Sequence, residues 1–138
     1  MGRASRSKGQ RGERELAILL AELTGRDVRR RVRQHGGDAD LEGLPGWAIE
    51  CKRYARATPA LLGRWWQQAC AQAQAEGPQV LPLLCVRTDR APDWVFYWPA
   101  GVHVPDAQRQ PASIADCVAG SPLVWCLMVR RVAPPWQP

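Results

Sequence analysis

A strand–turn–strand segment at residues 36–53 constrains the fold of this chain more than any other stretch. It reads GGDADLEGLPGWAIECKR, which is two strand-like runs joined by a turn rich in glycine and proline. A three-residue turn at positions 44–46 sets a register in which Asp40 lies directly opposite Glu50. A two-residue turn instead places the two residues on opposite faces of the sheet. The length of the turn therefore decides whether two carboxylates meet.

The second strand of this segment ends in Glu50-Cys51-Lys52. Side chains alternate along a strand, so Glu50 and Lys52 point to one face and Cys51 points to the other. Two opposed carboxylates repel each other unless a cation lies between them, and oxygen ligands suit Mg²⁺ or Mn²⁺. The same register places Asp38 opposite Lys52, either as a second metal ligand or as a partner that keeps the lysine charged.

Length and composition indicate a single domain. The 138 residues suffice for one real core but not for two, and 46% hydrophobic residues with seven Trp argue against disorder. No apolar run approaches the roughly 20 residues that cross a bilayer, and the basic N-terminus lacks the apolar part of a secretory signal. The five Cys form no CxxC pair, which predicts reduced thiols and a cytoplasmic protein. With only two His, a zinc site is not expected.

The positive charge is concentrated in the first quarter of the chain. Residues 1–35 hold ten Arg or Lys against four acids, which accounts for the whole net charge of +6. A basic surface beside a carboxylate cluster suggests that a polyanion is brought to a metal ion. The alternative is a solubilising tail next to a solvated strand.

Hydrophobic periodicity predicts the order helix, three strands, helix, strand. Residues 1–11 are expected to be a flexible basic arm, 12–24 a helix that ends before Gly25, and 27–34 a strand with one cationic side. Thr58-Pro59 is an N-cap and first-turn pair for a second helix that runs to about residue 76.

The later part of the chain is predicted to be rich in strands. Residues 79–87 read as a strand buried on both faces, 94–98 and 123–129 as further strands, and 111–119 as a short helix. We therefore expect an α/β fold, a mixed central sheet flanked by helices, with a strand-rich C-terminal addition. The single domain of residues 1–138 divides into the arm at 1–11, a core at 12–90 and the addition at 91–138.

With these residues in hand, the chain resembles the PD-(D/E)XK nuclease superfamily. Over roughly residues 8–90 it is most similar to archaeal-type Holliday junction resolvases. The matching motifs are Lys8-Gly9, Gly12-Glu13-Arg14-Glu15-Leu16, Asp40-Leu41 and Glu50-Cys51-Lys52. The Gln-x-x-x-Tyr pattern of the RecB-type branch is absent, which lowers the prospect of a processive exonuclease of that branch. The resemblance implies a restriction-endonuclease-like fold with an αβββαβ core.

The resemblance also implies roles for individual residues. Glu13, Asp40, Glu50 and Lys52 would be the catalytic positions. Asp40, Glu50 and the main-chain carbonyl of Cys51 would bind the metal, with Glu13 reaching it through water. The implied cofactor is Mg²⁺, for which Mn²⁺ can substitute. The implied protein is a homodimeric endodeoxyribonuclease that acts on four-way junctions or other branched DNA, with no membrane partner.

The basic residues near these positions are candidates for contacts with DNA phosphates. They are Lys8, Arg11, Arg29, Arg30, Arg31 and Arg33. The alternative for the arginines is an edge strand that charge protects against aggregation. Two other functions stay open: a nickase, repair or restriction-type nuclease on ordinary duplex, and a DNA-binding protein that keeps the fold without catalysis.

Overall fold

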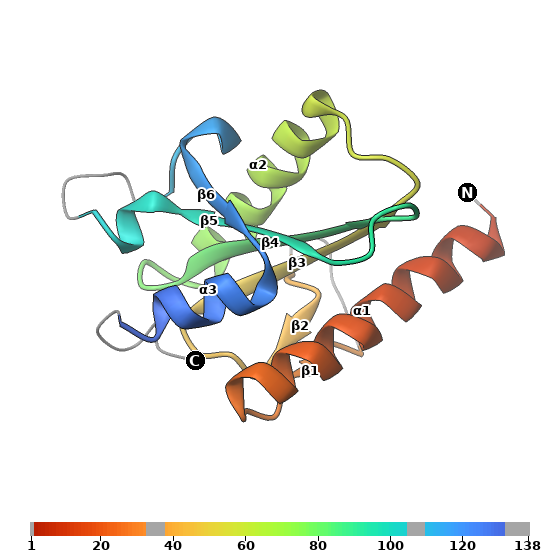
Figure 1. Cartoon of the computed structure of the whole chain (residues 1–138), viewed down its shortest axis with the longest axis horizontal. Coiled ribbons are helices and arrows are strands. Elements are labelled where there is room, and N and C mark those ends of the chain that lie inside the picture. Colours follow the sequence, from red (N-terminus) through yellow and green to blue (C-terminus); the bar gives the residue numbers. More distant parts are fainter. Residues whose placement is uncertain (1, 33–37, 105–109, 132–138) are drawn as a thin grey trace.

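A six-stranded mixed sheet forms the centre of the computed structural model, which describes residues 2–32, 38–104 and 110–131 (Figure 1). The helices are α1 (Arg3–Thr24), α2 (Pro59–Glu76) and α3 (Pro122–Val129), with short 3₁₀ turns η1 (Ala100–Val102) and η2 (Ile114–Asp116). The strands are β1 (Arg29–Arg30), β2 (Leu41–Glu42), β3 (Trp47–Tyr54), β4 (Leu81–Thr88), β5 (Val95–Pro99) and β6 (Cys117–Gly120).

The strands lie in the sheet in the order in which they occur in the chain. β3 and β4 are parallel and are connected through α2, whereas every other neighbouring pair is antiparallel. α1 and α3 cover one face of the sheet, and α2 covers the other (Figure 1). The predicted fold class, a mixed sheet flanked by helices, is confirmed.

The parallel strand β4 illustrates why the sheet carries helices on both faces. Leu83 and Cys85 belong to the core beneath α1 and α3, whereas Leu84 and Val86 pack with Trp66 of α2. All five side chains are buried. A strand buried on both sides reads as a continuous apolar run, and the prediction for residues 79–87 is confirmed.

The predicted register of the β2–β3 hairpin is confirmed within β2. Leu41 pairs with Ile49, and the Asp40 amide donates to the Ile49 carbonyl at 3.0 Å. Extended by one residue, this pairing places Asp40 opposite Glu50, as a three-residue turn requires. Gly46 has a φ of 84°, a backbone conformation that glycine adopts without steric cost.

The N-terminal helix is longer than predicted, because α1 begins at Arg3 and not at residue 12. The prediction of a flexible arm over residues 1–11 was wrong for the part of it that the structure describes as helix. Arg, Lys, Gln and Ala favour helix, and Lys8 is held by an ion pair to Asp89. The helix ends at Thr24 with Gly25 as its C-cap, as predicted.

Two expectations for the C-terminal part were wrong. Residues 123–129 were predicted to be a strand but lie in α3, which Ser121 caps by accepting a hydrogen bond from the Val124 amide. Pro122 at the first helical position favours that start, and an apolar run alone cannot distinguish a buried strand from a buried helix. The short helix expected at 111–119 is the single turn η2, followed directly by β6.

The strand predicted over residues 27–34 is shorter in the described residues, where β1 comprises only Arg29–Arg30. Val28 is buried, but Val32 is 83% exposed, so the predicted alternation does not extend to that position. Arg33 and Gln34 lie outside the described residues. The β5 strand and the capped α2 helix agree with the predictions for 94–98 and 58–76.

All five cysteines are free thiols; three of them are buried and two are half-buried. Across the described parts of the chain, none of the helices combines the length and the apolar character that crossing a membrane would require.

Candidate active site

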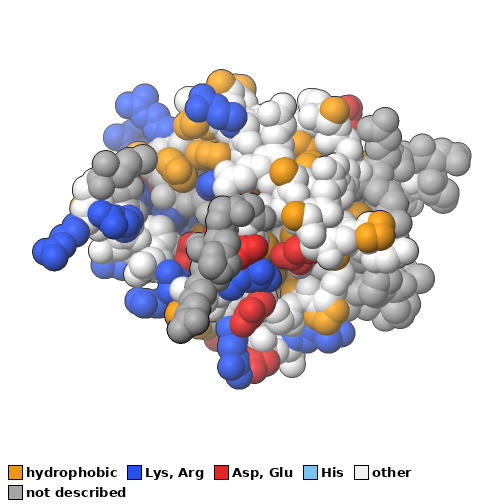
Figure 2. All heavy atoms as spheres, turned by 180° about the vertical axis from the view of Figure 1, so that it is seen from behind, with side chains coloured by type: hydrophobic (Ala, Val, Ile, Leu, Met, Phe, Trp, Pro, Cys, Tyr) orange, Lys and Arg blue, Asp and Glu red, His pale blue; other side chains and the backbone are white. Residues whose placement is uncertain are grey.

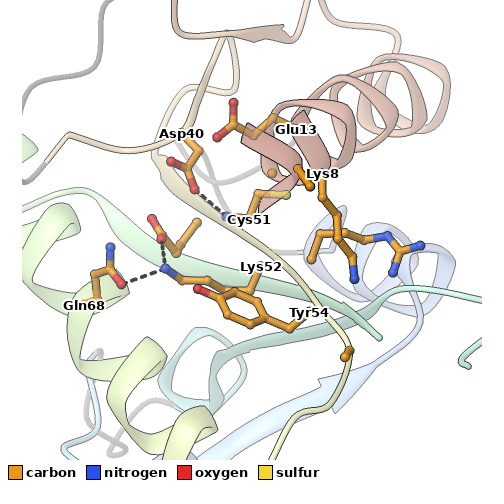
Figure 3. Close-up of a pocket in the computed structure, with 12 residues that line it drawn as sticks. Lys8, Glu13, Asp40, Cys51, Lys52, Tyr54 and Gln68 are labelled. Carbon is orange, nitrogen blue, oxygen red and sulfur yellow. Dashed lines mark hydrogen bonds and ion pairs between the residues drawn. The ribbon is translucent and has the colours of Figure 1, made fainter. Parts of the chain in front are cut away.

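A cavity of about 600 Å³ opens where α1 passes the C-terminal half of β3 (Figure 3). Four predicted catalytic side chains line it, together with several neighbours. The lining includes Lys8, Glu13, Asp40, Glu50, Cys51, Lys52, Arg53, Tyr54 and Gln68. These residues are distant from one another in the sequence. Position 13 lies on α1, position 40 directly precedes β2, and positions 50–52 lie on β3, and the fold brings all of them to this cavity.

Asp40 stands where the β2–β3 hydrogen-bond ladder ends. Its Oδ2 accepts a hydrogen bond from the backbone amide of Cys51 at 2.8 Å, so a side chain satisfies a strand amide (Figure 3). The residues before β2 therefore do not continue the regular backbone hydrogen bonding with β3. This contact fixes the Asp40 carboxylate at the cavity wall.

Glu50 and Lys52 share one face of β3, as the alternation predicts. Lys52 Nζ lies 2.8 Å from Glu50 Oε1, and it also donates to Gln68 Oε1 of α2 at 2.8 Å (Figure 3). Glu50 is only 1% exposed, and its second oxygen, Oε2, has no hydrogen-bond partner among the described residues. One carboxylate oxygen is therefore buried without a partner beside the cavity.

Glu13 of α1 faces this group from the other side of the cavity. Its carboxylate points toward Asp40 (Figure 3), and it pairs with Arg30 Nε at 2.5 Å. Glu15, the next acid along α1, pairs with Arg87 at 3.3 Å and lines a separate cavity beside Ile18. The structure thus places Glu13, and not Glu15, at the candidate site.

The environment of Asp40 favours the protonated, neutral form of its carboxyl group. Burial raises the pKa of Asp40 to about 8, and the negative charges of Glu50 and Glu13 act in the same direction. The Cys51 amide and Lys52 oppose that rise. Burial also raises the pKa of the Cys51 thiol, on the opposite face of β3. When Asp40 is ionised, it adds a third negative charge to those of Glu50 and Glu13, and the Cys51 amide and Lys52 only partly offset the resulting repulsion.

The residues present fit a hard divalent cation. Glu50 Oε2 is a buried, unpartnered oxygen, and Asp40 lies opposite Glu50 in the register. No group of three His, Cys, Asp or Glu side chains among the described residues could hold a metal ion by itself. Mg²⁺ does not need such a group, because it usually keeps several waters and binds one or two carboxylates.

The arginines near β1 lie in ion pairs with acids of the same chain. Arg29 pairs with Asp27, Arg30 with Glu13, and Arg31 with Glu76 at 3.5 Å and Glu42 at 3.9 Å. Arg11 is exposed on α1, and Lys8 lines the cavity. Arg33, also predicted to contact DNA, lies outside the described residues.

Asp38 is not among the residues that line the cavity. Its charge acts on Glu76 of α2, where burial is the larger cause of a raised pKa.

Sequence reasoning missed three residues at the cavity. Gln68 of α2 was not among the predicted site residues, yet its side-chain amide oxygen accepts a hydrogen bond from Lys52. Arg53 and Tyr54 continue β3 past the catalytic positions, and the Tyr54 ring packs 4.7 Å from the Trp65 ring. Arg53 follows Lys52 directly, so its position on the same strand was a signal available in the sequence.

The chain also matches a known protein family. A family model described as phage putative PDDEXK endonuclease matches residues 4–107, a stretch that contains all four predicted catalytic positions. A search of curated proteins found no match. The family model covers more than half of the chain and both sides of the cavity. The chain therefore belongs to the phage putative PDDEXK endonuclease family.

Proposed function

We propose that this protein is a metal-dependent endodeoxyribonuclease that hydrolyses phosphodiester bonds in branched DNA, with Mg²⁺ as its cofactor and Mn²⁺ as a substitute. The observation that carries the proposal is the buried, unpartnered Oε2 of Glu50, in a cavity that also contains Asp40, Lys52 and Glu13. PD-(D/E)XK nucleases generally use divalent metal ions, and the family match supports the same chemistry here.

Asp40 and Glu50 would hold the metal ion, together with the main-chain carbonyl of Cys51. When bound, the ion would polarise a phosphoryl oxygen and lower the pKa of a water molecule. The Cys51 amide holds Asp40 in place, and burial keeps competing water away from Glu50. Glu13 stands at the opposite wall, at a position from which it would act through water.

Lys52 is held in place by two acceptors, Glu50 Oε1 and Gln68 Oε1. Its ammonium group would stabilise negative charge that develops on the phosphate, or would orient the attacking water. Gln68 fixes the direction of the lysine without adding charge, so we assign it a positioning role.

Branched DNA is the proposed substrate because residues 8–90 resemble junction resolvases in both motif and order. A resolvase makes paired cuts and therefore needs two sites, so the proposal includes a homodimer. The basic residues of α1 and β1 would contact backbone phosphates, which gives affinity with little sequence preference.

The test is cleavage of a labelled four-way junction and a matched linear duplex by the wild type and by Glu50→Gln. Each reaction is run with Mg²⁺, with Mn²⁺ and with EDTA. We expect paired nicks in the junction alone, lost in EDTA and reduced at least 100-fold in the variant, as for loss of a metal ligand.

Other outcomes separate the competing functions. Equal metal-dependent cutting of the duplex would retain the nuclease and reject the junction substrate. Binding without cutting under every condition would indicate a non-catalytic DNA-binding protein. Glu13→Gln and Glu15→Gln form a matched pair on α1, and only Glu13→Gln is expected to reduce cleavage.

A further inference from the structure

Asp89 lies between two cations at the edge of the candidate active site. Lys8 Nζ is 2.6 Å from Asp89 Oδ1 and 2.7 Å from Oδ2, and Arg53 Nη1 is 2.8 Å from Oδ1. Both cations line the cavity that contains the candidate metal-binding carboxylates, whereas Asp89 lines the adjoining one. An anion supplied by the chain itself thus occupies a position beside the site where two cations converge.

Arg53 is directed to this position by close packing against α1. A Cβ atom placed on Gly12 would lie 2.8 Å from Arg53 Cβ and 3.3 Å from Cγ, so the arginine stem crosses the helix where a side chain is missing. Its side chain is only 20% exposed. The guanidinium is therefore held in one direction and is not a freely moving surface charge.

Asp89 is fixed by the sheet but remains accessible. It directly follows β4, and its amide donates to the carbonyl of Tyr54 at the end of the parallel strand β3. Its side chain is 43% exposed. The hydrogen bond from Lys8, followed by the charges of Lys8 and Arg53, lowers the pKa of Asp89, so the carboxylate is ionised at neutral pH.

The basic surface continues beyond Asp89. The adjoining cavity shares Ala55 with the first one and is lined by Arg56 and Arg90, both exposed. Figure 2 shows the molecule from behind the view of Figure 1. On the left of this view, where the N-terminal half of α1 lies, Lys and Arg side chains gather. A strand of DNA that entered the active site would leave it over these cations.

We propose that Lys8 and Arg53 form a subsite for a backbone phosphate of the DNA substrate, and that Asp89 occupies this subsite in the free protein as an exchangeable counter-anion. The inference rests on the proposed function, since it takes DNA to be the substrate. A phosphate and a carboxylate present similar oxygen acceptors to Lys and Arg. A phosphate would therefore replace the carboxylate without any rearrangement of the two cations. Asp89 would then weaken binding and would favour ligands with enough charge to displace it.

The experiment measures the affinity of fluorescent duplex and four-way-junction DNA without metal, over a series of NaCl concentrations. Asp89→Asn is compared with Asp93→Asn, which makes the same charge change at an exposed position outside both cavities. Lys8→Gln and Arg53→Gln are compared with Arg64→Gln, a change on the α2 helix outside both cavities. Thermal melts verify that each variant folds, as expected for exposed ion pairs.

We expect Asp89→Asn to bind DNA roughly tenfold more tightly than wild type, because DNA no longer has to displace a carboxylate from two ion pairs at the protein surface. Lys8→Gln and Arg53→Gln should bind several-fold more weakly, with a salt slope reduced by about one phosphate contact each. The Asp93 and Arg64 controls should change affinity much less.

Equal effects of Asp89→Asn and Asp93→Asn, or of Arg53→Gln and Arg64→Gln, would overturn the subsite even in an active nuclease. Tighter binding by Asp89→Asn in a protein that never cuts DNA would reject the proposed nuclease function and retain the subsite.

Discussion

Glu50 is a carboxylate held almost entirely out of water, and Lys52 is the cation that compensates its charge. The two groups are 2.8 Å apart, and Lys52 is itself mostly buried. A buried ion pair contributes little net stability, but removing one partner leaves an uncompensated charge. The pair therefore makes the fold depend on residues whose proposed purpose is catalysis.

The first prediction concerns Lys52→Met, which keeps the apolar stem and removes the charge. In EDTA it should lower the free energy of unfolding by about 3 kcal/mol, the typical cost of breaking a buried pair. The double variant Glu50→Gln/Lys52→Met should regain at least half of that loss while remaining inactive. Urea unfolding measures both effects. An unchanged denaturation midpoint for Lys52→Met would contradict the burial of the pair.

Asp40 gives a prediction about pH. Its pKa rises from 3.8 to about 8 on folding, so between these values the folded protein binds more protons than the unfolded chain. Stability of the metal-free protein should therefore fall as pH rises through this window. In EDTA at about pH 9, Asp40→Asn should be more stable than the wild type by several kcal/mol, because each pKa unit corresponds to about 1.4 kcal/mol and Asn avoids the buried charge.

Thermal melts from about pH 5 to 9 test this prediction, with Asp93→Asn as the control for an exposed carboxylate. Parallel curves for wild type and Asp40→Asn would contradict it. Added Mg²⁺ should reverse the order, because it stabilises only the chain that retains the ligand.

At the scale of secondary structure, α1 carries two glycines with opposite roles. A Cβ atom placed on Gly9 would meet open space, whereas one on Gly12 would lie 2.8 Å from the Cβ of Arg53. Gly9→Ala should raise the free energy of unfolding by about 0.5–1 kcal/mol through helix propensity. Gly12→Ala should lower it, since β3 and α1 must separate. Urea unfolding compares the two, and equal stabilisation would show that the contact yields.

The elements that sequence reasoning predicted well are those with a clear local signal. Residues 79–87 form an apolar run bounded by polar residues, and Thr58-Pro59 marks the start of α2. The hairpin register follows from its turn, and with it the placement of Asp40 opposite Glu50. The candidate site was largely predictable because most of its acids belong to one hairpin.

The elements predicted wrongly depend on distant contacts. The first turns of α1 look like a polar tail, and their ion pair to Asp89 lies 81 residues away in the chain. α3 is apolar on every side, so no periodicity distinguishes it from a strand; its Trp125 packs edge-on against Trp47 and Phe96. Gln68 and Asp89 likewise become site residues only through packing of α2 and β4 beside β3.

At the scale of the whole molecule, α3 leaves an apolar surface. Trp125, Cys126 and Val129 face the core, whereas three large apolar residues on the other side are exposed: Leu123, Val124 and Leu127. A helix that is hydrophobic on all sides is normally buried on all sides. This surface is our candidate for the contact between two copies in the proposed homodimer.

The last prediction follows from that candidate. Wild-type protein should sediment at twice the mass of the 15.4 kDa chain, and Leu127→Glu should sediment as a folded monomer. The charge would be buried against apolar side chains in the dimer but exposed in the monomer, so it acts on association and not on folding.

The monomer should still bind metal but lose paired cutting of a junction. Gln67→Glu, which adds the same charge at an exposed position on α2, is the control. A wild type that sediments as a monomer while making paired nicks would show that two sites are not required, and an unaffected Leu127→Glu dimer would place the interface elsewhere.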